Sequence, residues 1–344
     1  MLTSDILKSD VIGKIPAVKQ SAYTNKWETV EEELGRAEFN EIFSHIRMIY
    51  QKAKLKTTVL DSFREHVLQV ETDPEKFVDE TLIRYSNAYQ VVTNASYESS
   101  ADPSRVNQML SWLQKIDNVD WIPPAMLYMH FYNGDVDKLS SFYEGLERLA
   151  ASMFIRRSDV NDRIERYAKV IKSIQERADL WANNSPLMLS DIEKQETIGV
   201  LDGEIYNANA RVRTYVLLRL DSFLSDGAAV YNQKVLTVEH VLPQTVDANS
   251  EWAQTWPEEE VRKNWVHRVG NLVLLSRRKN SEAQNFDFDI KKEKYFKTKS
   301  GVSSFAITTQ VLSKDDWTID RVRQRQIEMV DKFKQGWELY DCHV

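Results

Sequence analysis

Residues 236–245 read LTVEHVLPQT, and this stretch decides the fold of the C-terminal half of the chain. It is a short apolar, β-prone run that ends in Glu239 and His240. Pro243 closes it, because proline cannot donate to a central ladder of hydrogen bonds. The pattern predicts a strand that carries a histidine at its own end.

A second β-prone run, at 272–275, follows Gly270 and Asn271 in the sequence VGNLVLLS. It passes into a basic segment of helical character, RRKNSEAQNF, which contains Asn280. Two strands and a helix, with a histidine and asparagines at their junctions, are therefore predicted as an α+β core at 234–298.

Phosphodiester hydrolysis is the chemistry that these residue types suit. A neutral imidazole, with an ordinary pKa of about 6.5, can take a proton from water near pH 7, so His240 is the predicted general base. Glu239 and Asn280 offer the oxygen ligands that Mg²⁺ or Mn²⁺ accepts. Asn271 is expected to bond backbone groups across the loop and to hold His240 in orientation.

The layout resembles the ββα-metal core of HNH nucleases. More specifically, EHVLPQ, GNLVLLS, KNS, QNF and Lys291-Lys292 with Tyr295 resemble the C-terminal HNH-like domain of the GmrSD family. These are type IV, modification-dependent restriction enzymes. The resemblance implies a metal-dependent endonuclease that acts on double-stranded DNA, including modified phage DNA, in restriction and antiviral defence.

The nine-residue step from Asn271 to Asn280 is also similar to the HNH domain of RNA-guided CRISPR nucleases, where a DH pair replaces the EH seen here. The likeness implies that Glu239 and Asn280 hold the metal, and that His240, Asn271 and Asn280 form the catalytic set. Glu239 departs from the aspartate of that pattern.

Upstream, the segments at 4–16, 26–50 and 213–221 resemble the helical middle of full-length GmrSD-type proteins, which carry a ParB-like N-terminal domain. This chain shows no Asp-Gly-Gln-Gln-Arg-like signature of that domain. A ParB-like recognition and NTPase domain or subunit is therefore an expected partner.

The charge distribution favours a nucleic-acid partner for the C-terminal half. The chain has a net charge of −7, yet residues 261–299 hold 11 Lys/Arg and 4 Asp/Glu, a net of +7. The predicted DNA-binding side chains are Arg277, Arg278, Lys279, Lys291 and Lys292. A solvated helix face would show the same charges, so this pattern alone does not decide the point.

The rest of the chain predicts a mainly α protein. Apolar residues recur at helical spacing through most of 1–180, and a last amphipathic helix is expected at 316–340. The sequence NNSP at 183–186 predicts a boundary between a helical domain at 1–185 and a nuclease domain at 186–344.

Composition limits the compartment and the cofactors. No apolar run approaches the ~18 residues of a membrane span, and the N-terminus carries acids, so a cytoplasmic protein without a membrane partner is expected. The single cysteine excludes a disulfide within the chain and a cysteine-rich zinc site.

Two alternatives stay open. The chain could be a non-catalytic DNA-binding module, or its helical half could be a scaffold that forms a homo-oligomer. Among the histidines, His267 is the other candidate for the base. The tetrapeptide Glu-His-Val-Leu also occurs around His66, but there the spacing is helical and no proline follows.

Overall fold

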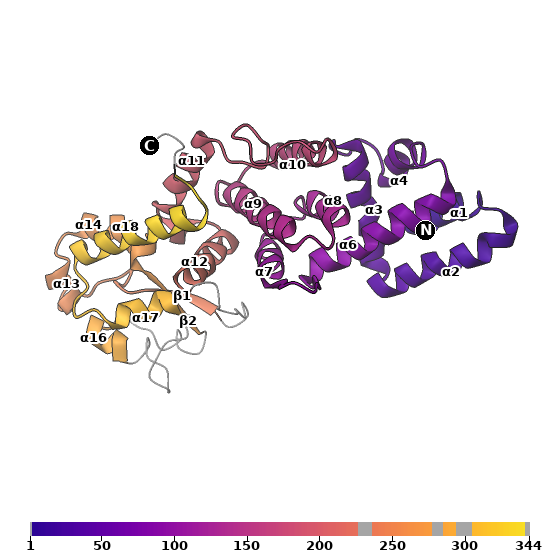
Figure 1. Ribbon diagram of the computed structural model, residues 1–344. Helices are drawn as coiled ribbons and strands as arrows, with labels where there is room; N and C mark the ends of the chain where they lie inside the picture. Colours follow the sequence, from indigo (N-terminus) through magenta and orange to yellow (C-terminus); the bar gives the residue numbers. More distant parts are fainter. Residues whose placement is uncertain (1, 226–235, 277–284, 294–304, 341–344) are drawn as a thin grey trace. The chain divides into compact units, whose positions relative to one another are not determined.

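The computed structural model describes residues 2–225, 236–276, 285–293 and 305–340. They group into two compact units (Figure 1). The N-terminal unit comprises residues 1–153 and 157–190, and the C-terminal unit comprises 154–156 and 191–344. The chain is mainly helical, as the sequence predicts. Among the described residues no helix is long and apolar enough to cross a lipid bilayer.

The N-terminal unit is built from helices whose positions follow the apolar spacing of the sequence. They are α1 (Thr3–Ile12), α2 (Ala17–Leu34), α3 (Arg36–Gln51), α4 (Val59–Phe63), η1 (Arg64–Leu68), α5 (Pro74–Lys76), η2 (Phe77–Leu82), α6 (Ile83–Asn94), α7 (Ser104–Leu113), α8 (Ile122–Tyr132), α9 (Val136–Ile155) and α10 (Val160–Gln175). Residues 154 and 155 of α9 are grouped with the C-terminal unit.

An aromatic cluster forms one part of the core of this unit. Trp27 of α2 lies 5.8 Å from the ring centroids of both Phe39 and Phe43 of α3, and Phe43 continues the contact to Phe63. All four side chains are fully buried. Aromatic rings at such separations contribute beyond their buried area, so α2, α3 and α4 are joined by packing rather than by propensity alone.

The C-terminal unit combines helices with two strands. Its elements are α11 (Asp191–Leu201), η3 (Ile205–Asn207), α12 (Ala210–Leu224), β1 (Leu236–His240), α13 (Glu251–Thr255), α14 (Glu259–Val266), η5 (Val269–Asn271), β2 (Leu272–Ser276), α16 (Phe288–Lys291), α17 (Ala306–Leu312) and α18 (Ile319–Gly336). Both predicted strands are present, and the expected C-terminal helix is α18. The helical segment predicted to carry Asn280 lies largely outside the described residues.

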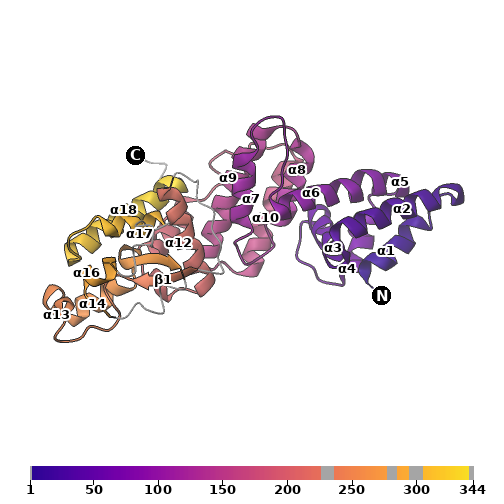
Figure 2. The ribbon, with the colours of Figure 1, turned by 90° about the horizontal axis from the view of Figure 1, so that it is seen from below.

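The two strands are antiparallel, and His240 at the end of β1 is opposite Leu272 at the start of β2. Residues 272–275 are all buried, which requires cover on both faces of the ribbon. The edge of β2 is completed by Thr308 of α17, whose hydroxyl donates to the carbonyl of Leu274 and accepts from its amide. Helices α12, α17 and α18 lie together beside the strands (Figure 2).

Two tryptophans anchor the segment between β1 and β2 to the core. Trp252 and Trp256 are each 2% exposed. The indole of Trp252 donates to the carbonyl of Phe286, and that of Trp256 donates to the carbonyl of Trp317. These two rings are therefore occupied inside the protein rather than free to stack on bases.

Gly270 allows helix α18 to approach the start of β2. A Cβ added at Gly270 would lie 2.7 Å from the carbonyl oxygen of Val322 and 3.1 Å from Gln326 Cβ. The Gly270 amide donates to Gln326 Oε1 (2.7 Å), and its carbonyl accepts from Arg325 Nη1 (2.7 Å). The glycine of the GNLVLL motif is thus required by close packing.

We predict that Gly270→Ala lowers the free energy of unfolding by about 1–3 kcal/mol, because the helix backbone must move to admit the methyl group. Gly199→Ala on the exposed face of α11, where the methyl group meets nothing within 4 Å, should instead raise it by about 0.5–1 kcal/mol. Urea unfolding of both variants checks this. Equal effects of the two substitutions would contradict the packing role of Gly270.

Candidate functional site

His240 lies at the end of β1 and is 4% exposed. Both ring nitrogens have partners. Gln244 Nε2 is 3.3 Å from His240 Nδ1, and His240 Nε2 is 3.2 Å from His267 Nδ1. An amide nitrogen can only donate, so Nδ1 of His240 accepts, and in the neutral ring Nε2 carries the proton and donates to His267. The basic lone pair therefore faces the exposed side chain of Gln244.

Burial lowers the pKa of His240 to about 3, and the charges of His267, Lys291 and Arg213 add to the effect. Burial also lowers the pKa of His267, while Glu204 opposes that shift. Because the folded pKa of His240 lies far below 7, its imidazole is neutral at physiological pH. A neutral ring is the form that can accept a proton.

Tyr206 of η3 supports both histidines. Its ring meets the ring of His240 edge-on at 4.2 Å between centroids and stacks on His267 at 5.3 Å. Its amide donates to the carbonyl of His267 (3.0 Å), and the guanidinium of Arg213 lies 4.4 Å from the centre of its ring. Sequence reasoning missed Tyr206, because nothing in EIYNAN marks a residue that packs on a site more than thirty residues away.

Asn271 is fully buried, and its side-chain amide joins three segments. Its Oδ1 accepts from the amide of Leu242 (2.8 Å) and the indole of Trp317 (3.0 Å). Its Nδ2 donates to the carbonyls of Leu242 (3.0 Å) and Val266 (2.9 Å). These bonds fix the chain just after His240 and just before His267, so Asn271 positions both imidazoles and lies away from solvent.

Glu239 and Lys291 form an ion pair in which the ammonium is buried and the carboxylate is partly buried. Lys291 Nζ is 3.0 Å from Glu239 Oε1 and 2.7 Å from the carbonyl oxygen of His240. Burial raises the pKa of the Glu239 carboxyl, and Lys291 pulls it down. Burial lowers the pKa of the Lys291 ammonium, and Glu239 pulls it up. Burial is the larger cause for both groups, so both net shifts favour the uncharged form, and the attraction between the two charges opposes them.

The predicted metal donors do not make a divalent-cation site in the described part of the chain. The Glu239 carboxylate is already bound to an ammonium, and Asn280 lies outside the described residues. No group of three or more His, Cys, Asp or Glu side chains in the described segments is arranged to hold a metal ion. The described side chains therefore do not by themselves make a complete Mg²⁺ or Mn²⁺ site.

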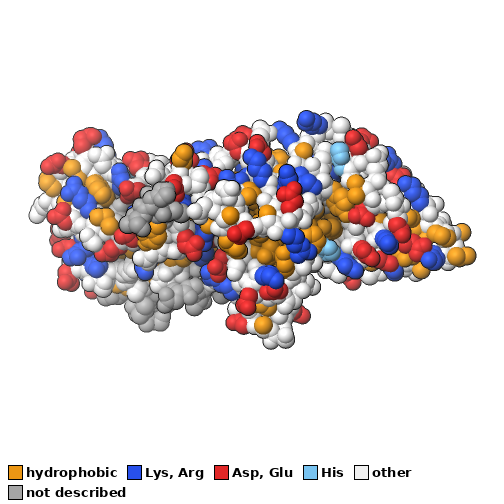
Figure 3. Space-filling view, turned by 45° about the horizontal axis from the view of Figure 1, so that its top comes forward, with side chains coloured by type: hydrophobic (Ala, Val, Ile, Leu, Met, Phe, Trp, Pro, Cys, Tyr) orange, Lys and Arg blue, Asp and Glu red, His pale blue; other side chains and the backbone are white. Residues whose placement is uncertain are grey.

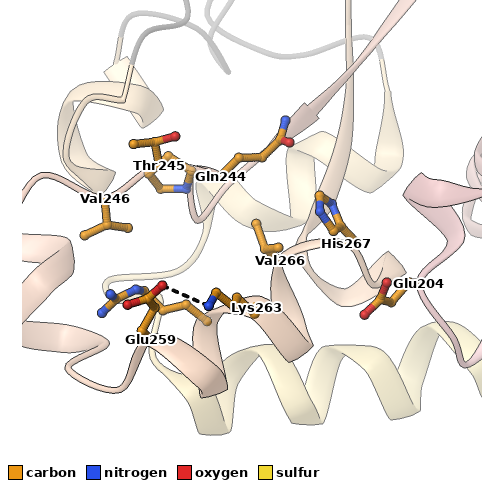
Figure 4. A pocket seen from close by; sticks show the side chains of 10 residues that line it. Glu204, Gln244, Thr245, Val246, Glu259, Lys263, Val266 and His267 are labelled. Atoms are coloured by element: carbon orange, nitrogen blue, oxygen red, sulfur yellow. Dashed lines mark ion pairs between the residues drawn. The ribbon is translucent and has the colours of Figure 1, made fainter.

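A cavity of about 600 Å³ lies beside the two histidines. His267, Gln244 and Glu204 line it together with Arg262 and Lys263 of α14 (Figure 4). It is a polar hollow that contains charges of both signs. His240 itself does not line this cavity, but two of the lining residues, Gln244 and His267, contact its ring.

The predicted DNA contacts are only partly described. Arg277, Arg278 and Lys279 lie outside the described residues. The prediction that Lys291 contacts DNA is corrected by the structure, because the Lys291 ammonium is buried against Glu239 and is not available to a phosphate. Lys292 is partly exposed and donates to the carbonyl of Lys314 (2.8 Å). On the face drawn in Figure 3, basic and acidic side chains are interspersed.

The fold and the site define a mainly helical protein whose C-terminal unit presents a strand-end histidine beside a polar cavity. Residues 200–332 match the family model of GmrSD restriction endonucleases, C-terminal domain. This match supports a GmrSD-family restriction endonuclease C-terminal region at these residues and confirms the resemblance seen in EHVLPQ and GNLVLLS. No curated protein and no solved structure matched the chain.

We predict that Asn271→Ala lowers the free energy of unfolding by about 3 kcal/mol or more, since it leaves several buried donors and acceptors without partners. Asn249→Ala is the matched control. Asn249 is exposed, so its replacement should change stability by roughly 0.5 kcal/mol at most. Chemical unfolding measures both, and a loss in Asn271→Ala as small as in the control would contradict its bridging role.

Proposed function

We propose that the C-terminal unit is an HNH-type DNA endonuclease in which His240 is the general base. The match of residues 200–332 to a restriction endonuclease domain supports a nuclease that acts on DNA. The observation that carries the assignment to His240 is its position, a neutral imidazole at the end of β1 beside the cavity.

The geometry supports a defined proton path. The Nε2–H group of His240 donates to His267, so the lone pair on Nδ1 is the one that accepts the proton from the attacking water. The exposed Gln244 side chain covers Nδ1 and has to move aside when a substrate enters. A bound phosphodiester also brings negative charge, which raises the pKa of a nearby imidazole toward the working range of a base.

Divalent-metal dependence is part of the proposal because the resemblance implies it. When bound, Mg²⁺ or Mn²⁺ would stabilise charge on the phosphate oxygens. The described side chains offer no complete donor set for it. The steps that can be assigned here are therefore those of the chain itself, which orients His240 through Asn271 and His267.

The proposed substrate is double-stranded DNA, with modified phage DNA as the target in restriction and antiviral defence. A ParB-like domain or subunit would supply recognition, and the cytoplasm is the proposed compartment. The basic stretch at 261–299 supports a polyanionic substrate. Arg262 and Lys263, two described members of that stretch, line the cavity together with His267.

The repeated tetrapeptide Glu-His-Val-Leu provides a matched test of the base. His66 lies in η1 and its ring contacts the side chain of Gln51 (2.9 Å), with no strand end beside it. His240→Gln should reduce nicking of supercoiled plasmid by at least ~10²-fold, the low end of what a positioned base contributes. His66→Gln should leave the rate unchanged. Melting temperatures of both variants establish that they are folded.

Full cleavage by the His240 variant would refute this assignment. Loss of cleavage by a folded His66 variant would show that the wrong copy of the tetrapeptide had been chosen.

Chelation tests the metal. EDTA should abolish plasmid cleavage, and Mg²⁺ or Mn²⁺ should restore it, while the melting temperature stays unchanged because packing and internal hydrogen bonds hold the C-terminal core together. Cleavage that persists in EDTA would remove the metal from the mechanism.

A further inference from the structure

The least expected feature of the site is the ammonium of Lys291. A lysine side chain is rarely fully buried, yet Lys291 is 1% exposed. It comes from the short helix α16, about fifty residues after β1 in the sequence. Its ammonium donates to Glu239 Oε1 and to the backbone carbonyl of His240, so it contacts the two consecutive residues at the end of β1.

The low exposure of both side chains opposes replacement of the Lys291 ammonium by a metal ion at Glu239. The Glu239 side chain is 14% exposed, and that of Lys291 is 1% exposed. If a divalent metal ion from solution bound to the Glu239 carboxylate, the ammonium of Lys291 would remain buried without its counter-charge and beside a second positive charge. Removing one partner from a buried pair costs far more than the pair itself contributes, so Lys291 is held firmly by Glu239.

The second contact of Lys291 reaches the base itself. Its 2.7 Å hydrogen bond to the His240 carbonyl fixes the peptide unit from which the imidazole projects. Asn271 fixes the backbone that follows His240, through hydrogen bonds to the amide and carbonyl of Leu242. The backbone that carries His240 is thus held from α16 and from η5, and the carboxylate of Glu239 is what keeps the α16 contact in place.

We propose that Glu239 and Lys291 form a positioning pair for His240, and that Glu239 anchors Lys291 rather than ligating a metal ion. This inference rests on the proposed nuclease function for its catalytic consequence, but the pair itself can be tested without cleavage.

The experiment compares the full chain with Glu239→Gln, Lys291→Met, the double variant, and Lys332→Met as control. Lys332 is an exposed lysine of α18, so its loss should change little. Melting temperature, Mn²⁺ binding by calorimetry, and kcat and KM for plasmid nicking are measured for each.

Each single variant at the pair should lower the melting temperature, and the double variant should recover most of that loss, because it buries no unpaired charge. The Mn²⁺ affinity of Glu239→Gln should stay within about twofold of the wild-type value, whereas a lost metal ligand would weaken it about 10-fold or more. Additive losses of melting temperature, or such a loss of Mn²⁺ affinity, would overturn the proposal.

The catalytic readout separates positioning from stability. Lys291→Met and the double variant should both have kcat reduced about 10-fold or more at nearly unchanged KM, since the His240 carbonyl has lost its donor in each. Wild-type kcat in the stable double variant would also overturn the proposal. If the wild-type chain fails to cleave DNA, the nuclease assignment fails, while the melting and Mn²⁺ results still judge the ion pair.

Discussion

The side-chain amide of Asn271 joins the three segments that meet at the candidate site. It bonds to both the backbone amide and the backbone carbonyl of Leu242. It also accepts from the Trp317 indole and donates to the Val266 carbonyl, all in the buried core. A polar group in such a place stabilises the fold only when every bond is made, and is costly when one is missing. The positions of both imidazoles follow from it, because His240 and His267 are near neighbours of the residues that it holds.

Other buried polar side chains in the C-terminal unit act in the same way. Arg325 of α18 is 4% exposed and donates to the carbonyls of Gly270, Leu272 and Ile307. Burial lowers its pKa to about 10, which still leaves the guanidinium charged at pH 7. Together with the contact that Thr308 of α17 makes to β2, these bonds let a ribbon of two strands exist without further strands beside it in the described residues. The precise placement of His240 therefore depends on side chains from helices rather than on a large sheet.

Local patterns in the sequence were sufficient for the secondary structure. The apolar run that ends at His240, the run at 272–275, and the apolar spacing of α3 and α18 each predicted an element that the structure contains. These features depend on residues close together in the chain, where periodicity and turn chemistry are informative.

The contacts that define the site could not be found in this way. Tyr206 and Lys291 reach His240 from segments more than thirty residues away, and each lies in a short helix whose sequence looks ordinary. The basic stretch predicted that Lys291 meets phosphate, because charge along a sequence does not reveal burial. Only the three-dimensional arrangement shows that its partner is Glu239.

The claim on which this account depends most is that the fold presents His240 as a neutral base with an unprotonated Nδ1 that faces Gln244. Nitrogen-15 NMR of histidine-labelled protein, assigned with His240→Gln, measures the protonation of each ring nitrogen directly. From about pH 8 to about pH 5, we expect His240 to stay neutral with its proton on Nε2, since its pKa is lowered to about 3. A His240 ring that is protonated on Nδ1 at neutral pH, or that titrates near its ordinary pKa, would contradict the account.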